Sequence, residues 1–225
     1  MCDTPTESEF ALCGSCWGDT PFIGGLCCDT CGAPLPGSGD GVQRVLCDDC
    51  MLIARPWSKG RSALVYKDAT RRMVMSFKHG DRTDLARAAG QWMARAAREI
   101  ITLESLLIPV PLHWLRLLKR RYNQSALLAR AVAHETGAET LPDGLIRPKR
   151  TAPLEGHSRD ARFATMQDAI RFSPKRKHQI EGRAVVLVDD VMTSGATLAA
   201  SAEACFAAGA SDVCVLALAR VVKDA

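Results

Sequence analysis

Two adjacent carboxylates stand between an apolar stretch and a loop of small, hydroxyl-bearing residues. Residues 185–188 (Val-Val-Leu-Val) predict a buried strand, and Asp189 and Asp190 follow it directly. The loop 193–197 (Thr-Ser-Gly-Ala-Thr) then leads into residues 198–208, which predict a helix. Hydroxyls and free amides at a helix N-terminus suit a phosphate monoester, and carboxylates accept hydrogen bonds from sugar hydroxyls. The pattern therefore predicts a sugar-phosphate site at the carboxyl end of a strand.

Paired cysteines are the second pattern with chemical meaning. The chain has 10 cysteines, and three C-x-x-C pairs fall in the first fifty residues: Cys13/Cys16, Cys28/Cys31 and Cys47/Cys50. Two such pairs supply the four thiolates of a structural zinc site. Disulfides are the alternative. Residues 1–9 have neither the basic start nor the apolar core of a secretory signal, so we expect a cytoplasmic chain whose thiols stay reduced.

Six paired cysteines are two more than one zinc ion needs and two fewer than two ions need. We favour the last two pairs as ligands, because Gly32 after the first of them suits a tight left-handed turn. The favoured ligands are Cys28, Cys31, Cys47 and Cys50. The rival grouping joins the first two pairs. Cys13 and Cys16 could also be half of a second site, completed by Cys2 or Cys27, or stay incomplete.

Charge divides the chain into two segments. Residues 1–54 carry eight acidic side chains and one basic one, whereas residues 55–225 carry 17 acidic and 28 basic ones. The first segment has few large apolar residues, so bound metal would supply its folding free energy. Its acidity argues against non-specific nucleic-acid binding. We expect a zinc module at 1–54 and a larger domain at 55–225; no apolar run reaches transmembrane length, so we expect no membrane partner.

Predicted strands and helices alternate in the second segment. The predicted strands are 62–66, 106–110, 185–188 and 213–218; the predicted helices are 68–77, 84–98 with Asp84 as its cap, one from Asn123 or Ser125 to Glu135, and 198–208. Alternation indicates an α/β fold with a central parallel sheet. Cys205 and Cys214 fall within these patterns and are predicted to be small core residues.

Basic residues gather after the predicted strand that ends at Val110. Arg116, Arg120 and Arg121 lie there, and guanidinium groups can bind a pyrophosphate with paired hydrogen bonds. The alternative is a solvated basic surface. A second polar stretch, 147–162, is predicted to be a mobile lid. A third cluster, 175–178, is predicted to be an exposed turn.

The segment 185–198 resembles the PRPP-binding motif of type I phosphoribosyltransferases. That resemblance implies that Asp189 and Asp190 hold the ribose hydroxyls and serve catalysis, and that the loop surrounds the 5′-phosphate. The implied PRPP-binding residues are Asp189, Asp190, Val191, Met192, Thr193, Ser194, Gly195, Ala196 and Thr197.

Nearly the whole chain resembles the ComF-type proteins, in which a zinc ribbon precedes a type I phosphoribosyltransferase domain. Beyond the patterns above, the matching segments are 77–82 (FKHGDR), 109–113 (PVPLH), 121–124 (RYNQ) and 158–162 (SRDAR). The chain departs from the family in having three cysteine pairs, where members often have four. It also has Pro153-Leu154-Glu155-Gly156 where members tend to place a glutamine.

The ComF resemblance implies a structural Zn²⁺, Mg²⁺ bound with PRPP, and transfer of phosphoribose to an acceptor that no residue identifies. It leaves open whether the protein is an enzyme. The alternative function is a protein that binds PRPP or a nucleotide without catalysis, or binds single-stranded DNA in DNA uptake and natural transformation. The basic domain supports DNA binding, although its aromatic residues show no interleaved stacking pattern.

Overall fold

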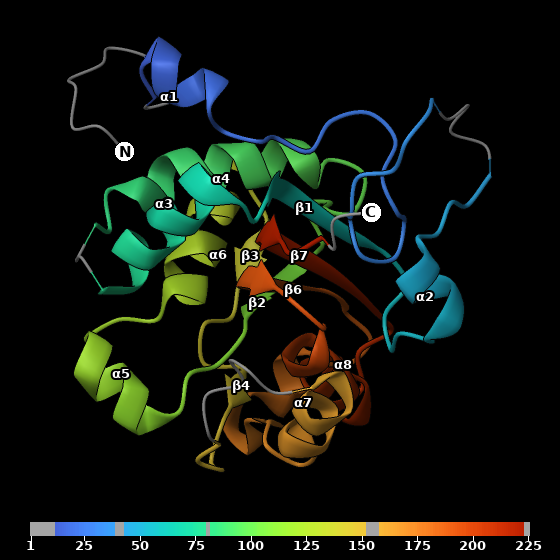
Figure 1. The fold of residues 1–225 in the computed structure, drawn as a ribbon. Helices are drawn as coiled ribbons and strands as arrows, with labels where there is room; N and C mark the ends of the chain where they lie inside the picture. Colours follow the sequence, from blue (N-terminus) through green and yellow to red (C-terminus); the bar gives the residue numbers. More distant parts are fainter. Residues whose placement is uncertain (1–11, 39–42, 80–81, 152–157, 223–225) are drawn as a thin grey trace.

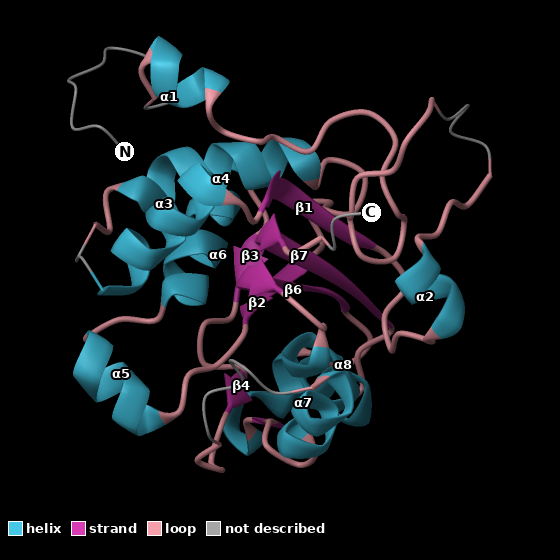
Figure 2. Ribbon diagram, in the orientation of Figure 1, coloured by secondary structure: helices cyan, strands magenta, loops and turns pink. Residues whose placement is uncertain are grey.

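A five-stranded parallel sheet forms the centre of the protein (Figures 1 and 2). The computed structural model describes residues 12–38, 43–79, 82–151 and 158–222. The strands, in their order across the sheet, are β1 (Gly60–Val65), β7 (Asp212–Arg220), β6 (Ala184–Met192), β2 (Leu106–Pro109) and β3 (Glu139–Thr140). All neighbouring strands pair in parallel. The predicted α/β fold with a central parallel sheet is confirmed.

Helices cover both faces of the sheet, so the strands are apolar on both sides. Val186 and Val188 belong to one buried cluster, with α3 (Asp68–His79), α4 (Leu85–Ala96) and α6 (Gln124–Thr136). Val185 and Leu187 belong to a second cluster, with α7 (Arg159–Met166) and α8 (Ala196–Ala207). This alternation along β6 follows from the two-residue period of a strand. No helix within the described ranges is long and apolar enough to cross a membrane.

The remaining elements are short. They are α1 (Gly14–Gly18), α2 (Asp48–Leu52), α5 (Trp114–Arg120), the antiparallel pair β4 (Leu145–Ile146) and β5 (Arg171–Phe172), and the 3₁₀ helix η1 (Pro174–Gln179). Helix η1 contains the third basic cluster, which is an exposed turn before β6 as predicted.

Several local predictions can be checked residue by residue. Asn123 caps α6 by accepting a hydrogen bond from the Ser125 amide, and Gly137 ends that helix in the left-handed conformation. Asp84 occupies the N-cap position of α4 as predicted, but it makes no capping hydrogen bond, because its carboxylate binds the Arg82 guanidinium instead. Cys205 and Cys214 are both buried, which confirms them as core residues.

The described part of the predicted zinc module, residues 12–38 and 43–54, packs onto the sheet. Its Cys28, Cys31 and Cys50 side chains belong to the same buried cluster as Val215 of β7 and Leu198 of α8. The polypeptide between the module and β1 supplies a further buried residue, Trp57, to that cluster.

Candidate ligand site and metal centre

The two carboxylates lie within β6, which runs four residues beyond its predicted end at Val188. Asp189 accepts hydrogen bonds from the Ser125 hydroxyl at 3.0 Å and from the Asp190 amide at 2.9 Å. Asp190 forms an ion pair with Lys78 of α3, with 3.0 Å between Nζ and Oδ2. Helices α3 and α6 therefore hold the acidic pair in place at the carboxyl end of the central strand.

Burial and the charge of Asp190 raise the pKa of Asp189 to about 7. The Lys78 ammonium and the Ser125 hydroxyl act in the opposite direction and offset part of that shift. A ligand or cation that favours the charged form of Asp189 would therefore displace a proton near neutral pH.

Two arginines donate hydrogen bonds to the backbone of residues 192–194, at the start of the predicted phosphate loop (residues 193–197, called the phosphate loop below). Buried Arg220 donates to the carbonyl oxygens of Met192 at 3.2 Å and Thr193 at 2.7 Å. Arg55 donates to the Ser194 carbonyl oxygen at 2.6 Å. In a trans peptide the carbonyl and the next amide point in opposite directions, so these contacts turn the following amides away from the arginines.

Three consecutive amides are thereby left without an acceptor among the described residues: Thr193, Ser194 and Gly195. Gly195 has φ +81° and precedes α8, which has no side-chain cap. Successive free amides at a helix N-terminus form a concavity suited to an anion.

An arginine cluster lies near the acidic pair and lacks carboxylate partners in the described parts of the chain. It consists of Arg116, Arg120 and Arg147. Burial lowers the pKa of Arg147 to about 10, with Arg116 contributing in the same direction and Asp189 opposing it. The Arg147 Nε has no hydrogen-bond partner, although the side chain also contacts Thr151 and Met166. One buried and two half-buried arginines without a carboxylate partner among the described residues mark a candidate anion site.

Arg147 lies at the start of the predicted mobile lid, and the sequence pattern does not indicate that it binds a ligand. In the structure Arg147 is 8% exposed, and α7 begins at Arg159 within the same predicted lid. Residues 152–157 lie outside the described residues.

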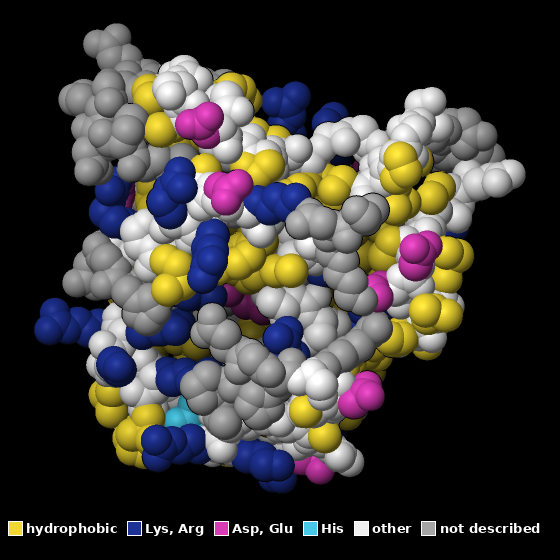
Figure 3. Space-filling model, viewed as in Figure 1, with side chains coloured by type: hydrophobic (Ala, Val, Ile, Leu, Met, Phe, Trp, Pro, Cys, Tyr) yellow, Lys and Arg dark blue, Asp and Glu magenta, His cyan; other side chains and the backbone are white. Residues whose placement is uncertain are grey.

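The three arginines predicted to bind pyrophosphate differ in their surroundings. Arg121 stands at the end of α5 with φ 66° and is exposed. Arg116 donates a hydrogen bond to the Thr151 carbonyl, and Arg120 donates one to the Gln124 side chain. Figure 3 shows Lys and Arg side chains gathered around a hollow in which acidic atoms are visible.

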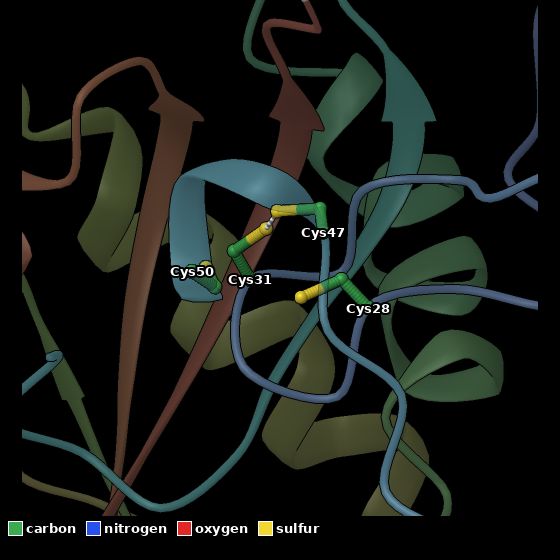
Figure 4. A group of neighbouring side chains, drawn as sticks. All are labelled: Cys28, Cys31, Cys47 and Cys50. Carbon is green, nitrogen blue, oxygen red and sulfur yellow. Dashed lines mark hydrogen bonds between the residues drawn. The ribbon is translucent and has the colours of Figure 1, made fainter. Parts of the chain in front are cut away.

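Four cysteines converge in the zinc module (Figure 4). The sulfur atoms of Cys28, Cys31, Cys47 and Cys50 all lie within 4.8 Å of one another. Bonds of about 2.3 Å to a tetrahedral zinc ion would separate sulfurs by roughly 3.8 Å, so the four residues fit the ion. Burial raises the pKa of the Cys47 thiol to about 11. Hydrogen bonds from Cys31 and Cys50 instead lower the pKa of the Cys28 thiol. A cation that holds the thiolates is therefore needed to ionise Cys47 at neutral pH.

Local backbone contacts shape this centre. The Gly32 amide donates to the Cys28 carbonyl at 2.8 Å, and Gly32 has φ +68°. Cys47 is the N-cap residue of α2, and the Cys50 amide donates to its carbonyl at 2.8 Å. The structure thus brings together the favoured grouping of cysteines.

Cys13 and Cys16 lie apart from the four-cysteine centre. They belong to α1 and its N-cap and pack with the buried cluster that contains α4. Cys2 lies outside the described residues.

Comparisons with known proteins agree with this organisation. The sequence model of a double zinc ribbon domain matches residues 1–51. The chain is 26% identical to "DNA utilization protein YhgH" of Escherichia coli K12, over 99% of this chain and 96% of that protein. It is 28% identical to the Salmonella typhi protein of the same name, over 87% and 84%. It is also 27% identical to "Competence protein F" of Haemophilus influenzae, over 77% and 78%.

Solved structures give only a weak match. The allosteric regulatory enzyme of purine biosynthesis is 20% identical with a TM-score of 0.42, over 64% of this chain and 29% of that one. The protein TT1426 of Thermus thermophilus is 18% identical with a TM-score of 0.38, over 62% and 85%. The zinc-binding module, the α/β domain and the relatives that extend along most of the chain support the resemblance to the ComF family.

Proposed function

We propose that the protein binds PRPP with Mg²⁺ at the carboxyl end of β6 and transfers phosphoribose to an acceptor. The observation that carries this proposal is the position of the acidic pair, Asp189 and Asp190, directly before three free amides. A ribose 5-phosphate needs both features, because its hydroxyls are donors to carboxylates and its phosphate is an acceptor for amides.

Each group has a separate role in this proposal. The acidic pair accepts the ribose 2′- and 3′-hydroxyls, and the phosphate loop holds the 5′-phosphate. Arg116 and Arg147 bind the pyrophosphate and stabilise its negative charge as it leaves. Lys78 holds Asp190 in place before the ligand arrives. Mg²⁺, when bound with PRPP, supplies further charge neutralisation on the pyrophosphate oxygens.

Calorimetry with PRPP in the presence and absence of Mg²⁺ tests the binding step, and pyrophosphate release with candidate acceptors tests turnover. We expect saturable binding that requires Mg²⁺. An absence of PRPP binding would refute the proposal. Binding with no pyrophosphate release from any acceptor would instead favour a PRPP-sensing protein.

Replacing Arg147 with Met is expected to weaken PRPP binding selectively. The change removes a charge-assisted hydrogen bond to pyrophosphate, which contributes about 1.5–3 kcal/mol, so PRPP affinity should fall by about tenfold to a hundredfold. Ribose 5-phosphate lacks the pyrophosphate, so its affinity should stay within about twofold. The matched control is Arg171→Met, because Arg171 is an exposed arginine on the paired strand β5. Equal losses for both ligands would contradict this role for Arg147.

The raised pKa of Asp189 predicts a pH dependence with a definite sign. The pKa of an aspartate in an unfolded chain is about 4. Below that pH, the protonated Asp189 makes its full contribution to the free energy of unfolding. That contribution is lost as the pH rises through about 7. Because binding favours the carboxylate, PRPP affinity should rise from about pH 6 to pH 8, with release of a proton. Calorimetry in buffers of different protonation enthalpy measures the release, which Asp189→Asn should eliminate.

One surface feature favours DNA binding as a second candidate function. Trp114 of α5 is 58% exposed and lies in the same short helix as Arg116, Lys119 and Arg120. An exposed indole among cations suits stacking with a base of single-stranded DNA. Two relatives are named for DNA utilization and competence. Binding of an oligonucleotide that weakens steeply with salt and is lost in Trp114→Ala would support this function. Unchanged binding in Trp114→Ala would count against it.

A further inference from the structure

We infer that the zinc module stabilises the conformation of the phosphate loop, and that Arg55 is the positioning residue that links the module to the loop. This inference rests on the proposed function for the identity of the ligand, and on contacts between described residues for the link itself. Arg55 lies just outside the module, in the connection to β1.

The link begins at the turn between the first two zinc ligands. Thr30 lies between Cys28 and Cys31, and its carbonyl oxygen accepts a hydrogen bond from the Trp57 indole at 2.6 Å. Thr30 and Trp57 are 4% and 5% exposed, so this hydrogen bond is shielded from water. The folding of the zinc turn therefore fixes the orientation of the indole ring.

The indole in turn positions Arg55. The guanidinium carbon of Arg55 lies 5.6 Å from the Trp57 ring centroid and 6.0 Å from that of Phe163 in α7. Arg55 thus contacts aromatic rings from two elements, one of them anchored to the zinc turn. Its Nη1 donates to the Ser194 carbonyl oxygen at 2.6 Å.

The phosphate loop touches both residues directly. A Cβ atom placed on Gly195 would lie 3.1 Å from Arg55 Nη1 and 3.2 Å from Trp57 Cη2. Glycine at this position, where φ is +81°, therefore allows the loop backbone to pack against the guanidinium and the indole.

The consequence concerns the peptide between Ser194 and Gly195. Arg220 of the sheet holds the carbonyls of Met192 and Thr193, whereas Arg55 alone holds the carbonyl of Ser194 among the described residues. Without Arg55 this peptide can rotate, and the Gly195 amide is no longer oriented before the phosphate arrives. The ligand would then have to order the loop as it binds, and the entropy cost of that ordering would lower the affinity for the phosphate.

The variant Arg55→Met tests this positioning role, because it keeps the apolar stem and removes the donors. We expect affinities for Mg²⁺–PRPP and for ribose 5-phosphate to fall together by about tenfold, since both ligands use the 5′-phosphate site. Arg147→Met should affect PRPP alone. Arg55→Lys should restore part of the affinity. The matched control is Arg44→Met, because Arg44 also donates a hydrogen bond to Thr30 but, within the described ranges, donates none to the loop.

A second readout needs no ligand. Hydrogen exchange of the peptide that contains residues 193–197 should be faster in Arg55→Met, and also in wild-type protein stripped of zinc, with exchange in β7 unchanged. Wild-type affinity together with wild-type exchange in Arg55→Met would overturn the inference. Failure of the wild-type protein to bind either ligand would refute the proposed function instead, and the exchange measurement would still decide whether zinc supports the loop.

Discussion

Replacing Asp190 with Asn is expected to reduce Mg²⁺–PRPP binding by about a hundredfold or more while leaving the protein folded. The amide keeps the size of the side chain but loses the negative charge that favours ribose hydroxyls and a nearby cation. Each charge-assisted hydrogen bond contributes about 1.5–3 kcal/mol, so the loss of two accounts for the expected change. Calorimetry measures the affinity, and thermal unfolding reports whether the fold is retained.

Two further variants make this experiment decisive. Glu139→Gln removes an acidic side chain that pairs with Arg183 at the edge strand β3, so it controls for a general change in charge. Lys78→Met removes the partner of Asp190 and leaves the carboxylate free, so it should preserve the Mg²⁺ requirement. Unchanged PRPP affinity in Asp190→Asn would show that the acidic pair does not hold the ribose.

Local sequence patterns correctly predicted the features that depend on residues close together in the chain. Residues 185–188 predicted the centre of β6, because four apolar residues in a row indicate a strand buried on both faces. The helix predicted from Asn123 or Ser125 to Glu135 corresponds to α6, because capping depends on side chains and backbone angles at the helix ends. The spacing of the last two cysteine pairs likewise predicted which thiols meet.

Residues that act through distant contacts were missed for a physical reason. Arg55 contacts Ser194 across 139 positions of sequence, and nothing near Arg55 indicates a phosphate loop. Arg147 resembled any other charge in a polar stretch until the structure showed it to be buried without a carboxylate partner in the described residues. Asp84 was predicted at the correct N-cap position, but Arg82 competes for the carboxylate that would have capped α4.

Helix α5 was missed for a different reason. It follows Pro111 and carries alternating apolar and basic residues, and none of its side chains is buried. Without a buried face, the segment has no periodic apolar pattern that would indicate a helix. The His113 side chain begins the helix by accepting a hydrogen bond from the Leu115 amide at 3.3 Å.

Replacing Cys50 with Ser is expected to release zinc and open the zinc module. Apparent zinc-binding free energies for four-ligand structural sites are about 10–16 kcal/mol, and the module has no separate apolar core to replace that contribution. The Trp57 indole would lose its fixed acceptor at Thr30, so its fluorescence should shift toward that of an exposed tryptophan. Elemental analysis of protein purified under reducing conditions measures the zinc content.

The matched control for Cys50→Ser is Cys27→Ser. Cys27 precedes a zinc ligand and is half-buried, but it lies outside the four-cysteine centre. It should therefore retain the wild-type zinc content and fluorescence, although both variants lose one thiol.

Loss of metal in Cys13→Ser but not in Cys47→Ser would move the site to the first two cysteine pairs. Wild-type protein with clearly less than one zinc ion per chain would contradict the metal centre altogether. The zinc module would then owe its fold to its packing against Trp57, Val215 and α8.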